Sequence, residues 1–233
     1  MTKRPAPPHI GTLNEKPLHA SLKAWMSEPG DTFEVGVGRF VADIVRDSLI
    51  IEIQTGSTFP LKRKLHALLK HHAVHLVIPI ARQKTIITVD ASGSVANSRK
   101  SPKRGELLDV FTHLVHLREF LGDANFSIEA LLIHVEEVRR PRTTRKCRWK
   151  DWEVQERRLV EVFDHVSFHH PGDYLAAIPS NLEEPFTTAD LAHAVGRPRR
   201  TAQQIAYCLR EMGALAVVDR KRTGFLYARN FDG

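Results

Sequence analysis

The stretch Arg39-Phe-Val-Ala-Asp-Ile-Val-Arg-Asp-Ser-Leu-Ile-Ile-Glu-Ile-Gln-Thr55 consists of two apolar, β-branched runs that meet at Asp47-Ser48. Two such runs separated by a pair of polar turn residues are typical of a β-hairpin. If these two residues form the turn, counting back along both strands places Asp43 directly opposite Glu52. Their Cβ atoms are then expected to lie about 5 Å apart on one face of the hairpin.

Side chains alternate along a strand, so Gln54 shares the face of Glu52, while Ile51 and Ile53 point to the other face. Two carboxylates that face each other repel, and burying them is costly without a compensating cation. A hard divalent cation held by oxygen ligands would compensate both charges. Asp43 and Glu52 are therefore the leading candidates for the chemistry of this protein.

This arrangement resembles the PD-(D/E)XK nuclease superfamily, in which one strand supplies an acidic residue and the next supplies acid-x-Lys or, in some members, acid-x-Gln. The matching residues are Asp43, Glu52 and Gln54. The resemblance implies phosphodiester hydrolysis with Mg²⁺ or Mn²⁺ held by Asp43, Glu52 and the backbone carbonyl of Ile53. It also implies a restriction-endonuclease-like α/β fold, a mixed sheet flanked by helices. No proline precedes Asp43, and Gln54 can orient a water or a phosphate but carries no charge.

A first helix is predicted from about Asn14 to Met26, with an apolar stripe formed by Leu18, Leu22, Trp25 and Met26. Glu15 falls on the edge of that stripe, where a glutamate needs a partner. Two interpretations remain open for it. The superfamily resemblance implies a helical glutamate beside the metal, whereas the alternative is a residue that completes the helix cap or interacts with the helix N-terminus.

A second helix is predicted after Thr58, on the evidence of Leu61, Leu65, Leu68 and Leu69. In the superfamily the helix after the acid-x-Lys strand packs across the site, and a basic residue on it can replace a missing lysine. Lys62 or Arg63 could therefore stand beside Gln54, and we take Lys62 as the candidate catalytic residue. The alternative is that both are solvated helix charges.

The remaining patterns predict one α/β domain over residues 1–138. Its helices are expected at 14–26, 58–69 and 105–121, and its strands at 33–38, 39–46, 49–55, 75–80, 85–89 and 127–138. The strands 75–80 and 85–89 are expected to form a hairpin, followed by a long loop at 91–104. We interpret the histidines of the chain's two clusters as structural or surface residues: His71, His72, His75, His169 and His170.

A basic segment at 139–152 marks the predicted boundary of a second domain at 153–233, in which the apolar segment 158–168 fits a helix or a strand. Helices near 188–195 and 199–212, followed by strands at 214–218 and 225–228, resemble a winged helix-turn-helix. A winged helix can also serve protein contacts or dimerisation. The side chains suited to base edges and phosphates are Arg199, Arg200, Gln203, Gln204, Arg220, Lys221 and Arg222.

The net charge of +7 and the pI near 9.6 favour a polyanionic partner, and nucleic acid is the commonest one. The basic residues occur in three clusters, at 99–104, at 139–150 and in the C-terminal region. Each cluster alone is more often a solvated loop, but three in one chain favour nucleic-acid binding. In the first cluster the candidate contacts are Arg99, Lys100, Lys103 and Arg104. Trp149 and Trp152 could stack on unpaired bases or pack at the domain junction.

No apolar run approaches the roughly 20 residues needed to span a bilayer, so no membrane association is expected. The basic N-terminus lacks the apolar segment of a signal peptide. Only two cysteines occur, Cys147 and Cys208, which argues against a disulfide framework. A reducing cytoplasm is the expected location.

Three functions fit these patterns. The first is a Mg²⁺-dependent nuclease acting on DNA with the help of a winged helix. The second is a non-catalytic DNA-binding regulator with a degenerate nuclease core, for which Gln54 is the supporting feature. The third is an RNA-processing nuclease. The whole layout also resembles a family of bacterial two-domain proteins that carries no established substrate. A homodimer is expected if the winged helix reads a palindrome.

Overall fold

The computed structural model describes residues 15–142, 151–176, 178–222 and 224–230. The predicted helix start at Asn14, and Cys147 and Trp149, lie outside these residues.

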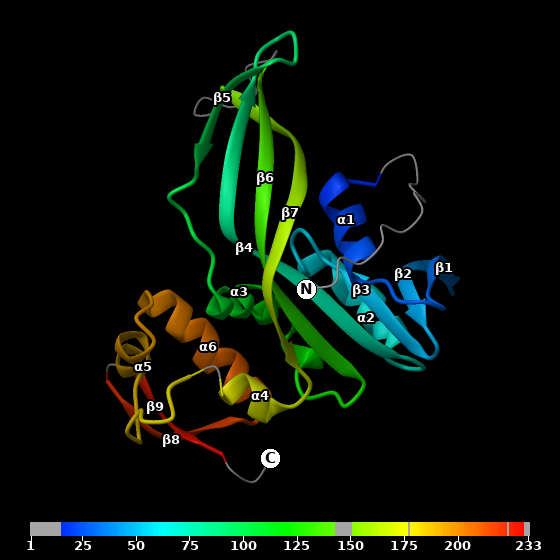
Figure 1. Cartoon of the computed structure of the whole chain (residues 1–233). Coiled ribbons are helices and arrows are strands. Elements are labelled where there is room, and N and C mark those ends of the chain that lie inside the picture. The colour runs from blue at the N-terminus through cyan, green and yellow to red at the C-terminus, as the bar shows by residue number, and fades with distance from the viewer. Residues whose placement is uncertain (1–14, 143–150, 177, 223, 231–233) are drawn as a thin grey trace.

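A large mixed sheet forms the centre of the molecule, with the strand order β1-β2-β3-β4-β6-β7 and with β5 added to β4 (Figure 1). The first three strands form an antiparallel meander, β3, β4 and β6 run parallel, and β7 is antiparallel to β6. This agrees with the predicted α/β class and mixed sheet. The strands are β1 (Thr32–Val37), β2 (Phe40–Arg46), β3 (Leu49–Ile53), β4 (Ala73–Val89), β5 (Val95–Lys100), β6 (Phe126–Pro141) and β7 (Trp152–Phe168).

Helices cover both faces of this sheet, and each face has its own apolar core. The helix α1 (Pro17–Met26) packs Leu18 and Leu22 on one face, against residues such as Ile51 and Leu131. The opposite face is covered by η1 (Phe59–Leu61), α2 (Lys62–Leu68), η2 (Leu107–Asp109), α3 (Val110–Leu114) and η3 (Val115–Phe120). The predicted helix at 105–121 is thus a short α-helix between two 3₁₀ turns. No helix among the described residues is long and apolar enough to cross a membrane.

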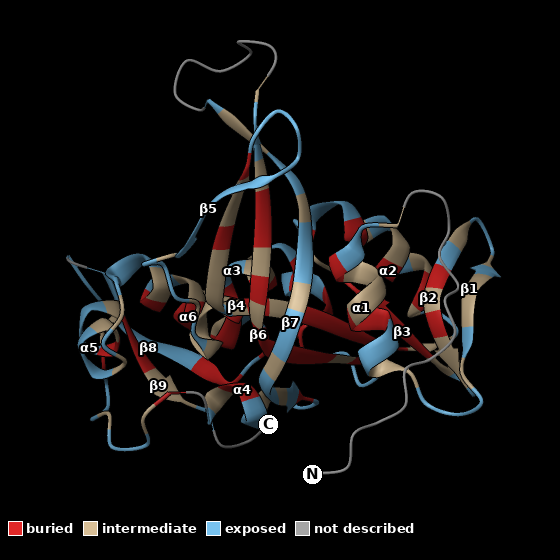
Figure 2. Cartoon of the chain, turned by 45° about the horizontal axis from the view of Figure 1, so that its top comes forward, coloured by how far each residue is buried: buried red, intermediate tan, exposed pale blue. Residues whose placement is uncertain are grey.

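The prediction of a hairpin between 75–80 and 85–89 is wrong. Residues Ala73–Val89 form the single strand β4, which pairs with β6 in parallel over most of its length. The polar residues Arg82-Gln-Lys84, expected to turn the chain, lie instead at a register shift between Ala81 and Gln83. The predicted loop at 91–104 contains β5, which is exposed throughout (Figure 2). The far halves of β4, β6 and β7, together with β5, project beyond the helices as an arm (Figure 1).

The predicted domain boundary also needs correction. The strand β7 pairs with β6 from Pro141↔Trp152 to Ile128↔Phe168, so residues 153–168 belong to the main sheet. The segment 139–152 therefore connects two neighbouring strands of one sheet rather than two domains. A run of basic residues without acidic partners resembled a linker in sequence, although its residues 139–141 end β6 and Trp152 begins β7.

The C-terminal unit contains the helices and the hairpin predicted from sequence. After α4 (Pro171–Leu175) come α5 (Thr188–Ala194), α6 (Arg199–Glu211), β8 (Leu215–Lys221) and β9 (Gly224–Arg229). Thr187 starts α5 with a capping box, in which its hydroxyl accepts from the backbone N–H of Asp190.

This unit shares one continuous apolar core with the main sheet. Ala202, Ile205 and Cys208 of α6 are buried in the same cluster as Phe111 and Leu114 of α3. Polar contacts reinforce the junction, because the Arg197 guanidinium pairs with Glu106 and Asp109. The sheet and the C-terminal helices are therefore packed against each other as one body.

Candidate functional site

The hairpin of β2 and β3 has the predicted register. Arg46 pairs with Leu49 and Ile44 with Ile51, so that Asp43 and Glu52 are the next residues along the two strands. Asp47 in the turn has a φ of +52°, a conformation that Asp tolerates better than most residues. Beyond the last backbone pair, the Asp43 carboxylate accepts a hydrogen bond from the Ile53 N–H at 2.8 Å. The Asp43 side chain therefore fixes the backbone of the strand that carries Glu52.

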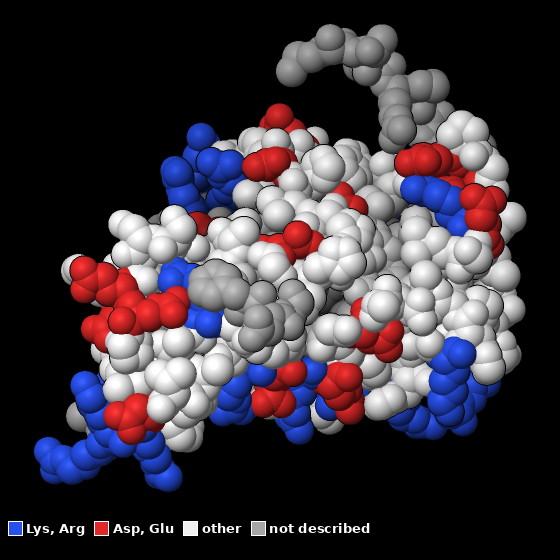
Figure 3. All heavy atoms as spheres, turned by 90° about the horizontal axis from the view of Figure 1, so that it is seen from below, with Lys and Arg blue, Asp and Glu red and all other residues white. Residues whose placement is uncertain are grey.

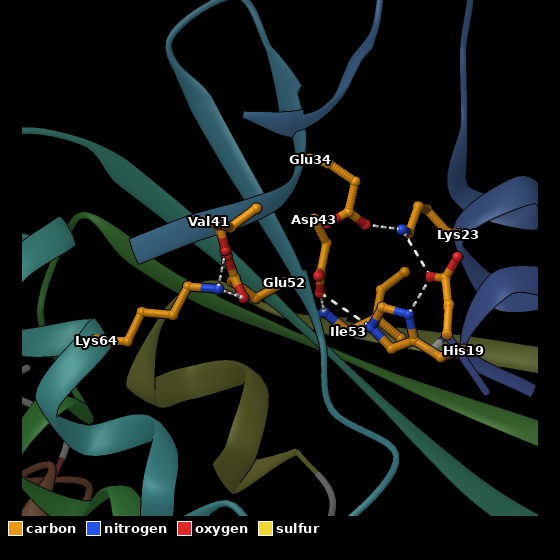
Figure 4. A network of polar contacts seen from close by, with 9 residues as sticks. His19, Lys23, Glu34, Val41, Asp43, Glu52, Ile53 and Lys64 are labelled. Carbon is orange, nitrogen blue, oxygen red and sulfur yellow. Dashed lines mark hydrogen bonds and ion pairs between the residues drawn. The ribbon is translucent and has the colours of Figure 1, made fainter. Parts of the chain in front are cut away.

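Glu52 lies against α2, where Lys64 contacts it (Figure 4). The Lys64 ammonium group donates to Oε2 of Glu52 and, at 2.6 Å, to the backbone carbonyl of Val41. Only 4% of the Glu52 side chain is exposed, and its Oε1 atom has no hydrogen-bond partner in the part of the chain that the structure describes. Within the described part of the chain, one oxygen of this buried carboxylate thus lacks a partner although a fixed cation lies beside it.

Burial, together with the charge of Asp43, raises the pKa of Glu52 to about 7, although Lys64 acts in the opposite direction. Asp43 behaves differently. Its burial is outweighed by the hydrogen bonds from His19 and Ile53, so its pKa is held below the usual value. At neutral pH the site therefore holds the ionised carboxylate of Asp43 and a partly protonated carboxyl group of Glu52.

The raised pKa predicts a pH-dependent stability that Glu52→Gln removes. The native carboxyl binds its proton more tightly than the unfolded one, whose ordinary pKa is 4.5, so its contribution to stability falls as pH rises from 4.5 to about 7. The difference between the unfolded pKa of 4.5 and the native pKa of about 7 corresponds to about 3 kcal/mol of stability at most. Urea unfolding in EDTA should show the Glu52→Gln variant gaining stability relative to the wild type between pH 5 and pH 8. Parallel pH profiles of the two proteins would contradict this assignment.

A second set of charges reaches Asp43 from α1. The His19 imidazole contacts Asp43 Oδ2 through Nε2 at 3.2 Å and Glu15 Oε1 through Nδ1 at 2.6 Å (Figure 4). Lys23, one turn further along, pairs with Glu15 at 2.6 Å and with Glu34 of β1. Glu15 therefore does not cap the helix, whose N-cap residue is Lys16, but it is linked to Asp43 through His19.

His19 is positively charged in this arrangement. Both of its neighbours are carboxylates with lowered pKa values, and an ionised carboxylate only accepts hydrogen bonds. Both imidazole nitrogens must then donate, which requires the protonated form. Although burial disfavours the charge, the hydrogen bonds to Asp43 and Glu15 raise the pKa of His19. His19 thus holds Asp43 in one orientation and balances part of the negative charge of the site.

The structure places Lys64, not Lys62, beside the carboxylate pair. Lys62 contacts Glu119 at 2.7 Å, and the Gln54 amide donates to the carbonyl of Ser57 at 2.6 Å in the loop after β3. Reasoning from sequence missed Lys64 because the way in which α2 packs against the hairpin decides which of its charged residues meets Glu52.

His19 and Lys23 were also missed. Glu15, His19 and Lys23 follow one another at intervals of four residues, the spacing that places side chains on one helix face. This polar stripe beside the apolar one is the signal that could have identified them.

The residues around Asp43 and Glu52 fit a magnesium ion. Mg²⁺ is usually held by one or two carboxylates, with water and substrate oxygens completing its shell. Among the described residues, no donor or cation contacts Oε1 of the buried Glu52 carboxylate. The described residues contain no group of three or more His, Cys, Asp or Glu side chains suited to a metal. An ion here would therefore depend on water or substrate for its remaining ligands.

Comparison with known proteins identifies the family. Residues 16–169 match a family model described as a domain of unknown function, DUF8091. The chain belongs to the DUF8091 family. A protein of Treponema pallidum (strain Nichols), described as an uncharacterized protein, is 32% identical over 184 residues, which make up 78% of this chain and 73% of the relative. No solved structure matches the chain.

The DUF8091 match supports the corrected domain boundary. It begins at the N-cap of α1 and ends immediately after β7, so it covers the complete main sheet and the carboxylate pair. The C-terminal helices and the β8–β9 hairpin lie outside the match. Apart from Glu15, which precedes the match by one residue, the charged residues of the site are all inside the DUF8091 domain.

The predicted nucleic-acid contacts occupy several separate places. Arg99 and Lys100 lie on the exposed strand β5, and Lys103 and Arg104 follow it. In the C-terminal unit the exposed candidates are Arg199, Arg200 and Gln203 at the start of α6, and Arg220, Lys221 and Arg222 at the tip of the β8–β9 hairpin. Figure 3 shows separate groups of basic side chains on the lower face of the molecule, with acidic ones between them.

Gln204 has a different environment from the other candidates on α6. Its side-chain Oε1 accepts a hydrogen bond from the Thr112 hydroxyl of α3 at 3.2 Å. Gln204 therefore lies at the junction with the main sheet, and the exposed start of α6 is formed by Arg199, Arg200 and Gln203.

Proposed function

We propose that this protein is a magnesium-dependent nuclease that hydrolyses phosphodiester bonds, with DNA as the favoured substrate. The observation that carries the proposal is the buried Glu52 carboxylate next to the ionised Asp43. Its Oε2 atom accepts a hydrogen bond from Lys64, and its Oε1 atom has no hydrogen-bond partner among the described residues. Two acids and a fixed lysine in this order on a β-hairpin and the following helix also support the superfamily resemblance.

The residues have distinct tasks in such a reaction. A magnesium ion held by Asp43 and Glu52, with the Ile53 carbonyl as a further candidate ligand, would polarise the phosphate and acidify an attacking water. Lys64 is fixed by Glu52 and the Val41 carbonyl, so its charge can stabilise the negative charge that develops on a neighbouring phosphate. His19 and the Ile53 N–H both donate to Asp43 Oδ2, so Oδ1 would be the ligand atom of this carboxylate.

The C-terminal unit is proposed to hold the substrate as a winged helix. Its helix-turn-helix and hairpin order supports this, as do Arg199, Arg200 and Gln203 at the exposed start of α6. The basic tip of the β8–β9 hairpin suits phosphates, and the exposed strand β5 offers a second basic surface. We place the reaction in the cytoplasm, and a homodimer would follow from a palindromic target.

Cleavage of labelled duplex DNA, single-stranded DNA and RNA, with Mg²⁺ or Mn²⁺, tests the proposal. The wild type should cut at least one substrate only with metal, whereas Asp43→Asn and Glu52→Gln should not. Glu119→Gln, which alters a surface carboxylate paired with Lys62, is the matched control and should retain cleavage. Mg²⁺ should also raise the thermal midpoint of the wild type more than that of Glu52→Gln, which measures binding without turnover.

The alternative is a DNA-binding regulator with a non-catalytic core. It is favoured by the Gln54 amide, which is bound to the Ser57 carbonyl instead of standing free beside the carboxylates. Duplex binding by wild type and both acid variants, without cutting in any metal, would establish this function. Cutting of RNA alone would identify an RNA-processing nuclease.

A further inference from the structure

A cavity lies on the α1 face of the sheet, away from Lys64 and Glu52. Its volume is about 590 Å³, within the range of small-molecule sites. The end of α1, the start of β6 and the end of β7 surround it, with Trp25, Ser127 and His165 among its lining residues. None of the residues assigned to the proposed nuclease site lines it.

The floor of this cavity is a connected polar chain. His75 contacts the Ser127 hydroxyl through Nδ1 at 2.7 Å and the Glu129 carboxylate through Nε2 at 2.9 Å. The other oxygen of Glu129 contacts Nδ1 of His165 at 2.7 Å. The register of β4 and β6 explains this grouping, because His75 pairs with Ser127, and Glu129 is two residues further along the same face.

The walls of the cavity carry flat rings. Trp25 meets His165 edge to face, with centroids 5.8 Å apart and an angle of 70° between the rings. His75 and His169 lie nearly parallel, at 6.2 Å and 21°. Trp25 is 37% exposed at the opening, although a large aromatic side chain is usually more deeply packed. The cavity thus offers flat surfaces around a hydrogen-bonding floor.

The charges of the cavity disfavour an anion, and both Glu129 oxygens already contact an imidazole, which leaves neither of them free for a cation. Although burial acts against it, the hydrogen bonds from His75 and His165 hold the pKa of Glu129 below the usual value, so a carboxylate stands at the floor. It would repel a phosphate or carboxylate. The Arg46 guanidinium at the rim is already bound to Asp31, Glu28 and the Met26 carbonyl. A purely apolar ligand would remove water from this polar floor without offering it a hydrogen bond.

We propose that this cavity binds a neutral, planar heteroaromatic ring with hydrogen-bonding edges, of the size and chemistry of a nucleobase. The ring stacks on or meets the edges of Trp25 and His165, and its polar edge faces Ser127 and the imidazoles of the floor. This assignment depends only on the lining of the cavity and is independent of the proposed nuclease activity.

Binding of free nucleosides to the full-length protein tests the proposal. Adenosine, guanosine, cytidine and uridine are titrated in EDTA, which excludes the metal site, with calorimetry and ligand-observed NMR as readouts. At least one of them should bind saturably, and toluene, a ring without polar edges, should bind more weakly. Trp25→Ala and His165→Ala should each weaken nucleoside binding by about three- to tenfold, the usual worth of one aromatic contact.

The matched control is His66→Ala, which removes a histidine of α2 that contacts Glu119 and Phe120 outside the cavity. Trp25 and His165 are both partly exposed, so their variants are expected to fold, and circular dichroism checks this. The proposal is overturned if no nucleoside binds at concentrations up to about 10 mM, which is above the Kd of about 1 mM that marks weak binding. Equal binding of toluene, or binding that neither variant changes, overturns it as well.

Discussion

Replacing Lys64 with methionine is expected to slow metal-dependent cleavage by about 10²- to 10³-fold, the usual loss when one donor to a developing negative charge is removed. Methionine keeps most of the apolar stem but has no ammonium group for Glu52 and the Val41 carbonyl. Single-turnover rates at saturating protein measure the chemical step, while duplex affinity should change little. The loss therefore falls on the rate and not on binding.

Lys62→Met is the discriminating comparison for this prediction. Lys62 lies two residues earlier on the same helix but contacts Glu119, so its variant should cleave like the wild type. A loss as large in Lys62→Met as in Lys64→Met would show that the effect comes from the charge of α2 as a whole. Equal rates in Lys64→Met and wild type would remove Lys64 from the reaction.

Glu137→Leu is expected to lower the free energy of unfolding by about 3 kcal/mol, because it leaves several cations of the arm without their anion. The Glu137 carboxylate is buried on β6 and accepts two hydrogen bonds from Arg139, at 2.8 and 2.6 Å, and one from Arg157 at 3.0 Å. Lys84 of β4 approaches it at 3.4 Å. This expected loss of about 3 kcal/mol lies at the lower end of the range for breaking a buried ion pair, because Arg157 is half-exposed and can turn to water.

Urea unfolding at pH 7 and pH 3 measures the effect of Glu137→Leu. Burial raises the pKa of Glu137, but the hydrogen bonds and charges of these cations lower it more and hold it at about 2. The contribution of the Glu137 carboxylate to stability is therefore present above pH 4.5 and declines as pH falls toward 2. The difference between variant and wild type should therefore shrink at pH 3. Glu136→Gln, on the adjacent and less buried carboxylate, is the control and should stay within about 0.5 kcal/mol of wild type. Hydrogen exchange should be faster in β4 and β6 of the leucine variant alone.

The β2–β3 hairpin could be predicted from sequence because all of its information is local. Alternating apolar residues and the turn at Asp47-Ser48 determine the register within a few residues. The two helices and the hairpin of the C-terminal unit were predictable for the same reason. Capping residues and the glycine turn mark their ends directly in the sequence.

The length of β4 and the position of β7 could not be predicted in this way. Arg82-Gln-Lys84 is polar enough for a turn, but parallel pairing with β6 carries the strand through it. Likewise β7 has three register shifts, which interrupt the alternation that would have identified a strand. Both features depend on partners far away in the sequence. The contacts of His19 with Asp43 and of Lys64 with Glu52 likewise depend on how α1 and α2 pack against the hairpin.

The shared core between α3 and α6 has a geometric consequence for any duplex bound by the C-terminal unit. Ile205 and Cys208 are anchored in the same apolar cluster as Phe111, so the exposed start of α6 cannot swing independently of the sheet that carries Asp43 and Glu52. In the proposed nuclease, the distance between the bound sequence and the cut would therefore be constant. Cuts would fall at a fixed number of base pairs from the bound sequence, and lengthening the chain between α4 and α5 would leave that number unchanged.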